Sequence, residues 1–160
     1  MDARARDRFP ARMITNTALT EPFLVMQDLV QLHVPYQEAA GDFFVMEVTV
    51  APGGGPPPLH THPAQEFFWT LSGTLSYFRE DPDGLTEITG GPGTCALIPG
   101  GVPHTYRNFT DESASYLAVL SPAQQMQDFL VEAGEQLRSP EEVLAIGERF
   151  GLVILDVVPG

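Results

Sequence analysis

Four side chains in this 160-residue sequence have the types and spacing of metal ligands. His60 and His62 are separated by one residue, Glu66 follows four residues later, and His104 lies in a separate cluster. On an extended strand, residues i and i+2 point to the same face, so the first two imidazoles can reach one metal ion. Only a closed sheet could place His104 opposite that pair. Three imidazoles and a carboxylate suit divalent Fe, Mn, Co, Ni or Zn about equally well.

The alternative is that these histidines only make hydrogen bonds in a protein core. Three of the four histidines of the chain fall within the two clusters, which favours a metal site. The fourth, His33, lies on the polar face of a predicted strand, and we interpret it as structural. A site with a five- or six-coordinate metal would keep one or two positions open for substrate, water or O2.

The elements that must position these residues are short strands separated by turns. Fifteen Gly and fifteen Pro are spread through the chain, which is typical of an all-β sandwich or barrel. Alternation of apolar and polar residues gives the strands. We predict them at 29–34, 43–50, 67–71, 74–79, 85–88, 94–98, 104–109 and 115–120, with a possible last strand at 152–158.

The C-terminal part changes to helical periodicity. Ser121-Pro122-Ala123-Gln124 has the pattern of a capping box and predicts a helix over about 121–134. Ser139-Pro140-Glu141-Glu142 repeats the pattern and predicts a second helix over about 139–150. We divide the chain into a flexible N-terminal arm at 1–12 and one domain at 13–160, a length that suits a single core.

Two spaced motifs cover about a third of the chain and resemble those of the cupin superfamily. Gly54-x5-His60-x-His62-x3-Glu66-x6-Gly73 matches the first cupin motif at every fixed position, and Gly93-x5-Pro99-x-Gly101-x2-His104-x3-Asn108 matches the second. The resemblance implies an all-β fold, the cupin jelly-roll β-barrel (double-stranded β-helix), here with short C-terminal helices. It also implies that His60, His62, Glu66 and His104 are the ligands of one divalent transition metal per chain. Thr94 departs from the Asp that is common at its position, which is usually not a ligand.

Cupins with this ligand set include dioxygenases, decarboxylases, oxalate-type enzymes, isomerases and polyketide cyclases, and other cupins only bind or store small molecules. The Gly-Gly-Gly-Pro-Pro-Pro segment and the C-terminal helical tail resemble the single-domain, quercetin-dioxygenase-like group. That second resemblance favours an oxidoreductase, a dioxygenase that inserts O2 into an aromatic or enolic substrate such as a flavonol, with Glu66 as catalytic base. The alternatives are a metal-dependent isomerase or cyclase that does not use O2, and a non-catalytic small-molecule-binding protein.

Strand parity, counted from Glu66 and His104, predicts an inward face that is apolar and aromatic. Such a pocket suits a neutral or aromatic substrate better than a phosphosugar or dicarboxylate. The alternative is that these residues are simply core. The predicted substrate-pocket residues are Met46, Val48, Phe68, Thr70, Ile98 and Tyr106.

The net charge of −13 would repel phosphate backbones, so nucleic acid is a poor partner. No apolar run approaches the length of a membrane span, no secretory signal is recognisable, and we predict a cytoplasmic protein. The single cysteine, Cys95, excludes an intramolecular disulfide framework, and its apolar neighbours suggest a small core residue.

If Phe68 faces inward, Phe67, Trp69 and Leu71 form an outward apolar stripe. Pairing of this stripe in a homodimer is the predicted cover, and a monomer covered by its own helices is the alternative.

Overall fold

The structure is a computed structural model that describes residues 21–56 and 58–157. The predicted N-terminal arm at 1–12 lies outside the described residues. The strands and helices of the described part are β1 Phe23–Val25, β2 Asp28–Val34, β3 Phe44–Val50, β4 Pro58–Thr61, β5 Gln65–Ser72, β6 Leu75–Asp81, β7 Gly84–Gly90, β8 Cys95–Ile98, β9 His104–Arg107, β10 Ala114–Ser121, α1 Gln124–Gly134, α2 Pro140–Arg149 and β11 Val153–Val157.

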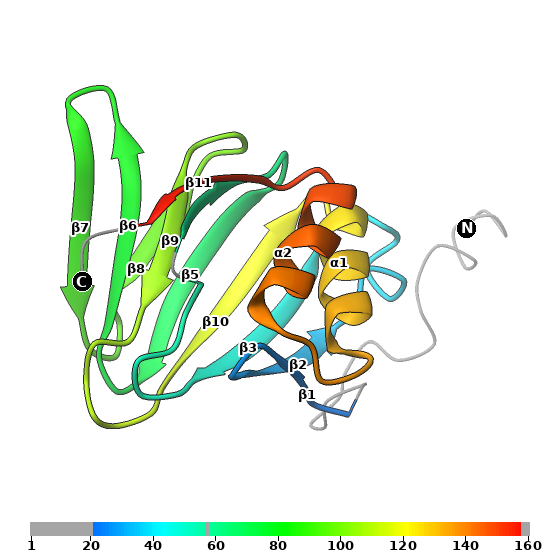
Figure 1. Ribbon diagram of the computed structural model, residues 1–160, viewed down its shortest axis with the longest axis horizontal. Helices are drawn as coiled ribbons and strands as arrows, with labels where there is room; N and C mark the ends of the chain where they lie inside the picture. The colour runs from blue at the N-terminus through cyan, green and yellow to red at the C-terminus, as the bar shows by residue number, and fades with distance from the viewer. Residues whose placement is uncertain (1–20, 57, 158–160) are drawn as a thin grey trace, which may run out of the picture.

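The strands form two antiparallel sheets, which confirms the predicted all-β jelly roll with two short helices (Figure 1). One sheet has the order β1-β2-β3-β10-β5-β8, and the other has the order β11-β4-β9-β6-β7. Most strands that are hydrogen-bonded neighbours in a sheet are distant in sequence, so strands from the first and second halves of the chain lie side by side. This topology is what brings the two ligand clusters of the sequence to one place.

Alternation along the strands builds the core. In β3, Phe44, Met46, Val48 and Val50 are at most 5% exposed, as their common parity predicts. In the edge strand β8, Ile98 is buried, whereas Cys95 and Leu97 face outward and are exposed. The interpretation of Cys95 as a core residue is therefore wrong. Its apolar neighbours lie on both faces of an edge strand, and only one of these faces is covered.

Two short strands were not predicted from the sequence. β1 has only three residues, too few for an alternation to appear. β4 begins at Pro58, at the end of a run that reads as a break in regular structure. Proline is tolerated at the first residue of a strand, because its missing N–H costs little there.

The start of the first helix differs from the prediction. α1 begins at Gln124, its N-cap residue Ala123 makes no side-chain capping bond, and Ser121 is the last residue of β10. The Ser121 hydroxyl instead donates to the carbonyl oxygen of Asp42 at 2.8 Å, so it cannot cap the helix. The second capping box is confirmed: the Ser139 side chain accepts from the Glu142 N–H, and the Glu142 side chain accepts from the Ser139 N–H.

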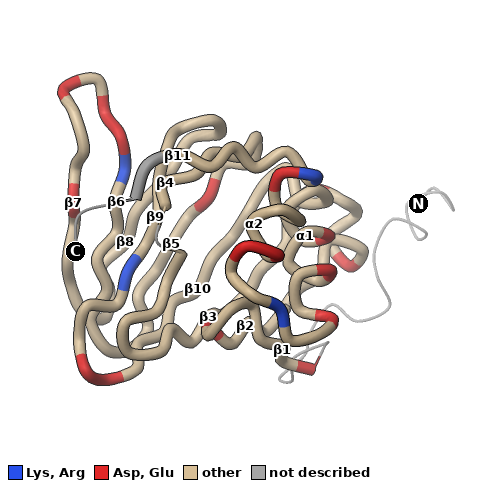
Figure 2. The backbone as a smooth tube through the Cα atoms, viewed as in Figure 1, with Lys and Arg blue, Asp and Glu red and all other residues tan. Residues whose placement is uncertain are grey.

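α1 packs beside β1 and α2, and α2 packs beside β11, with both helices at the end of the molecule away from the β6–β7 hairpin (Figure 1). Gly134 of α1 lies against the Phe23 ring, where an added Cβ would collide with it. Acidic side chains dominate the charged positions on the helices and on the β6–β7 hairpin (Figure 2). No helix among the described residues is long and apolar enough to cross a membrane.

Candidate metal centre

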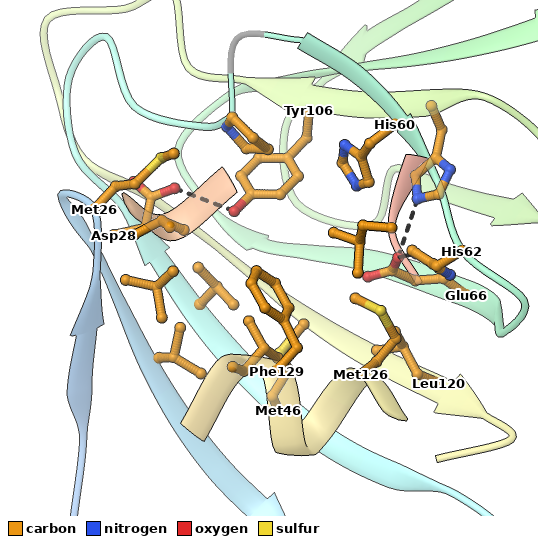
Figure 3. A pocket seen from close by; sticks show the side chains of 18 of the residues that line it. Met26, Asp28, Met46, His60, His62, Glu66, Tyr106, Leu120, Met126 and Phe129 are labelled. Carbon is orange, nitrogen blue, oxygen red and sulfur yellow. Dashed lines mark hydrogen bonds and ion pairs between the residues drawn. The ribbon is translucent and has the colours of Figure 1, made fainter. Parts of the chain in front are cut away.

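Pairing of β4 with β9 brings the two histidine clusters together. His60 of β4 and His104 of β9 are register partners across the small sheet, and His62 follows directly after β4. The ring centroids of His60 and His62 lie 4.7 and 4.8 Å from that of His104. One ligand atom from each of the three histidines lies within 4.8 Å of the others, and Figure 3 shows His60 and His62 on the same side of the cavity as Glu66.

Glu66 reaches the same point from the opposite sheet. It lies on β5, and its Oε2 is 3.1 Å from Nε2 of His62 and 3.3 Å from Nε2 of His104 (Figure 3). The Glu66 side chain is 5% exposed. The structure thus brings together all four side chains of the predicted ligand set.

The outer nitrogens of the rings fix how the histidines face this point. Nδ1 of His62 lies 2.9 Å from the carbonyl oxygen of Ala64, and Nδ1 of His104 lies 2.8 Å from that of Val102. A carbonyl oxygen can only accept, so each Nδ1 donates a proton to it and each ring turns its Nε2 inward. Second-shell bonds of this kind are those that orient metal-binding histidines.

The inward-facing groups therefore fit a bound cation. Nε2 of His62 and Nε2 of His104 both face one carboxylate oxygen of Glu66, so either protons on these nitrogens or one metal ion must lie between the three atoms. Three imidazoles and one carboxylate form a donor set for divalent transition metals. The residues present thus fit one such ion, and the donor set does not select its identity.

Burial sets the protonation states of two of the groups. Burial, with the nearby His104 and His62, lowers the pKa of His60 to about 3, so this ring stays neutral at physiological pH. Burial alone would raise the pKa of Glu66, but the hydrogen bonds from His104 and His62 together outweigh it and lower the pKa to about 2. Both groups are then in the form that binds metal.

The four ligand candidates form part of the wall of a mostly apolar cavity. The space that this wall bounds amounts to about 830 Å³ when the adjoining open solvent is counted. Of the predicted pocket residues, Met46, Val48, Phe68 and Tyr106 line this cavity. Thr70 and Ile98 are not in its wall: the Thr70 hydroxyl pairs with that of Tyr77 at 2.8 Å, and Ile98 lies in the core at 1% exposure.

Sequence parity did not identify the rest of the wall. α1 and α2 supply apolar side chains to it, as do β1, β11 and the turn after β1, because the helices pack over the open side of the large sheet. Asp28 of β2 and Tyr116 of β10 also line it. Nothing in the sequence marks a lone Asp at the start of a strand as part of a site. The wall also includes Met26, Met126, Phe129 and Leu130.

Several motif residues act on the backbone that carries the ligands. The Asn108 amide donates to the carbonyl oxygens of Val50, Ala51 and Glu112, which ties the segment after β9 to the segment after β3. Gly55 has φ of +95°, and a Cβ there would lie 2.2 Å from the Tyr106 carbonyl oxygen, so only glycine fits.

Part of the chain matches a known family. Residues 46–120, just under half of the 160 residues, match the sequence profile of the cupin domain. This segment is similar to that family. It contains all four ligand candidates and runs from within β3 to near the end of β10, whereas the helices that complete the cavity lie beyond it.

Solved structures of two other proteins share the fold. A recombinant oxalate oxidase bound to glycolate aligns with a TM-score of 0.58 and 17% identity, over 91% of this chain and 85% of that one. The polyketide cyclase RemF from Streptomyces resistomycificus aligns with a TM-score of 0.56 and 21% identity, over 69% of this chain and 80% of that one. At these identities the likeness concerns the fold alone.

A cupin-superfamily sugar phosphate isomerase from Silicibacter pomeroyi is 27% identical, with a TM-score of 0.47 over 57% of this chain. The match spans only 59% of that protein. Comparison with the sequences of curated proteins gave no match.

Proposed function

We propose that this protein is a metal-dependent dioxygenase that inserts O2 into a small aromatic or enolic substrate such as a flavonol. The observation that carries the proposal is the convergence of His60, His62, Glu66 and His104 on one point in the wall of an apolar cavity. The resemblance to the quercetin-dioxygenase-like cupins supplies the reaction class. When bound, a redox-active metal supplies Lewis-acid polarisation of a substrate oxygen and electron transfer with O2.

The apolar walls select the substrate and exclude water. Phe68, Tyr106 and Tyr116 place their rings against one another, with centroids 4.9 to 6.1 Å apart, and Phe129 covers the cavity from α1. Flat aromatic or enolic molecules stack well on such surfaces. The described side chains in the wall include no Arg, which disfavours a phosphorylated substrate.

Glu66 is the group that would take the proton of the substrate hydroxyl. With its pKa at about 2 it is a weak base while both histidines hold it. Because burial by itself raises the pKa, a carboxylate that moves off its histidine partners becomes a stronger base without leaving the site. We therefore propose that Glu66 shifts during turnover, alternating between holding the metal and accepting the proton.

The test is O2 uptake by protein reconstituted separately with Fe, Mn, Co and Ni, against a panel of flavonols and enolic diketones. Uptake that needs both metal and substrate and vanishes in Glu66→Gln supports the dioxygenase. Glu47→Gln is the matched control, because Glu47 pairs with His33 on a half-exposed strand face. Unchanged uptake in Glu66→Gln would remove the base role. Absence of uptake with metal bound would favour an isomerase, a cyclase or a binding protein.

We also propose that two copies pair through the outward face of β5. In the single chain Trp69 and Leu71 are 43% and 40% exposed, so neither the helices nor the described N-terminal strands cover this face. Leu97 of the neighbouring strand β8 extends the face and is 55% exposed. Apolar surface of this kind is commonly buried against a partner.

A further inference from the structure

Asp28 is a buried carboxylate in the cavity, away from the candidate metal centre. It is the first residue of β2 and is 5% exposed. Figure 3 shows the Tyr106 ring lying between Asp28 and His60, with His62 and Glu66 beyond His60. The cavity therefore has two polar ends, and apolar side chains such as Val30, Met46 and Phe129 line the space around them.

Within the described residues, both direct hydrogen bonds of this carboxylate go to one oxygen, while the Ala51 N–H lies near enough to favour its charged form. Oδ2 accepts hydrogen bonds from the Gly55 N–H and the Tyr106 hydroxyl, both at 3.1 Å. Oδ1 is buried and has no hydrogen-bond partner among the described residues. Gly54 packs closely against this atom, since a Cβ there would lie 2.5 Å from Oδ1 and 2.7 Å from the Ala51 carbonyl oxygen.

No ion pair compensates the charge. Among the described arginines, Arg107 is close enough to favour the charged form but donates to the Gly53 carbonyl oxygen, and Arg138 borders the adjacent cavity. Neither forms a salt bridge with Asp28 within residues 21–56 and 58–157. Burial raises the pKa of Asp28 to about 6, against the opposing effect of the Tyr106 and Gly55 hydrogen bonds.

A purely structural role does not explain these features. An asparagine oxygen would accept the same two hydrogen bonds without the cost of a buried charge, which is several kcal/mol. An unpaired carboxylate in the wall of a cavity that also holds candidate metal ligands is instead typical of a functional position. The unused oxygen is the part of Asp28 that the fold leaves without a partner.

We propose that Asp28, with the Tyr106 hydroxyl beside it, binds a hydrogen-bond donor of the substrate, a hydroxyl or an ammonium group. This inference rests on the proposed function for the other end of the cavity, where a substrate oxygen meets the metal. The substrate class is then a small molecule with a metal-binding oxygen at one end, an apolar or aromatic body, and a donor at the other end. Asp28 sets specificity, and Glu66 serves the reaction.

The test uses matched probes on zinc-loaded protein, because zinc is redox-inert. The probes are 1-arylbutane-1,3-diones whose ring carries a methyl, hydroxyl or aminomethyl group, each at the meta or para position. The enolic diketone is the metal-binding end, and the ring substituent reports on Asp28. Affinities are measured by calorimetry with the wild-type protein and with Asp28→Asn, which keeps an acceptor for Gly55 and Tyr106.

We expect the wild-type protein to bind a hydroxyl or aminomethyl probe at least about tenfold more tightly than its methyl counterpart, the effect of a hydrogen bond to a charged group. In Asp28→Asn this preference should fall below about threefold. The preferred substituent shows whether the donor is neutral or cationic. Equal affinities for methyl and donor probes in the wild-type protein, or a preference that survives in Asp28→Asn, would overturn the proposal.

The two proposals fail in different ways. If methyl probes bind equally well with and without zinc, the metal end is wrong, and the donor preference still reports on Asp28. If no probe binds, the melting temperatures of the wild-type protein and Asp28→Asn show whether Asp28 has a structural role. If Asp28→Asn melts at the same or a higher temperature than the wild type, the carboxylate is not needed for stability, which supports a role in ligand binding. If its melting temperature falls by 5 °C or more, on the order of 1 to 2 kcal/mol, the carboxylate instead stabilises the chain around Gly55 and the proposal is wrong.

Discussion

Replacing Asp28 with asparagine should change how stability depends on pH. Burial raises the pKa of Asp28 from its ordinary value of 3.8 to about 6 in the folded protein. The folded state therefore binds more protons than the unfolded state between these two values. Its contribution to stability is present below pH 3.8 and is lost as the pH rises through about 6.

The size of the effect follows from the shift. The difference between 3.8 and about 6 is about 2 pKa units, and each unit corresponds to about 1.4 kcal/mol. The wild-type protein should thus lose about 3 kcal/mol relative to Asp28→Asn between pH 4 and pH 7. Other titrating groups in the cavity, such as His60 and Glu66, are common to both proteins and cancel in the comparison.

The assay is urea unfolding of both metal-free proteins at a series of pH values from 4 to 7.5. We expect the free energy of unfolding of Asp28→Asn to rise relative to the wild type over this range and then to stay constant above about pH 7. A difference between the two proteins that stays constant within about 1 kcal/mol from pH 4 to 7.5 would refute the reasoning. It would mean that Asp28 has an ordinary pKa, and therefore that water or an unseen partner solvates it.

Three other expectations follow from buried or exposed groups. Because burial lowers the pKa of His60 from 6.5 to about 3, the metal-free protein should lose stability as the pH falls through this window, and His60→Gln should flatten that loss in urea unfolding. Asn108→Ala removes three donated hydrogen bonds and should lower the free energy of unfolding by about 2 to 4 kcal/mol. Urea unfolding measures this loss, and equal stability of the two proteins would contradict it. Trp69→Glu should convert a dimer to a monomer in sedimentation experiments. The control is Leu137→Glu, which should leave the dimer intact because Leu137 is 88% exposed in the loop between the helices. A dimer that persists in Trp69→Glu would contradict pairing through β5.

The sequence predicted the ligand candidates and most strands because both depend on local spacing. His60 and His62 follow a strand period, and β3 alternates cleanly over its length. The meeting of His104 with the first cluster depends on pairing of β4 with β9, far apart in sequence. The cupin motif implied that meeting, whereas periodicity alone could not have predicted it.

The errors arise where tertiary contacts override local patterns. Ser121 fits a capping box by spacing, but its hydroxyl is bonded to the Asp42 carbonyl oxygen. Cys95 lies among apolar residues, but the edge position of β8 leaves its outward face open. Asp28 could not have been placed in the cavity, because its role depends on Tyr106, 78 positions away. Parity likewise could not separate Phe68, in the cavity wall, from Thr70, behind it.

Metal stoichiometry tests the central claim of a three-histidine, one-glutamate centre most directly. Equilibrium dialysis with Co(II) would be measured on the wild-type protein, on His62→Ala and on His33→Ala, which removes the histidine outside the cluster. The account predicts one ion per chain for the wild-type protein and His33→Ala, and loss of most of the metal in His62→Ala. One ion per chain retained by His62→Ala, or no binding by the wild-type protein, would contradict it.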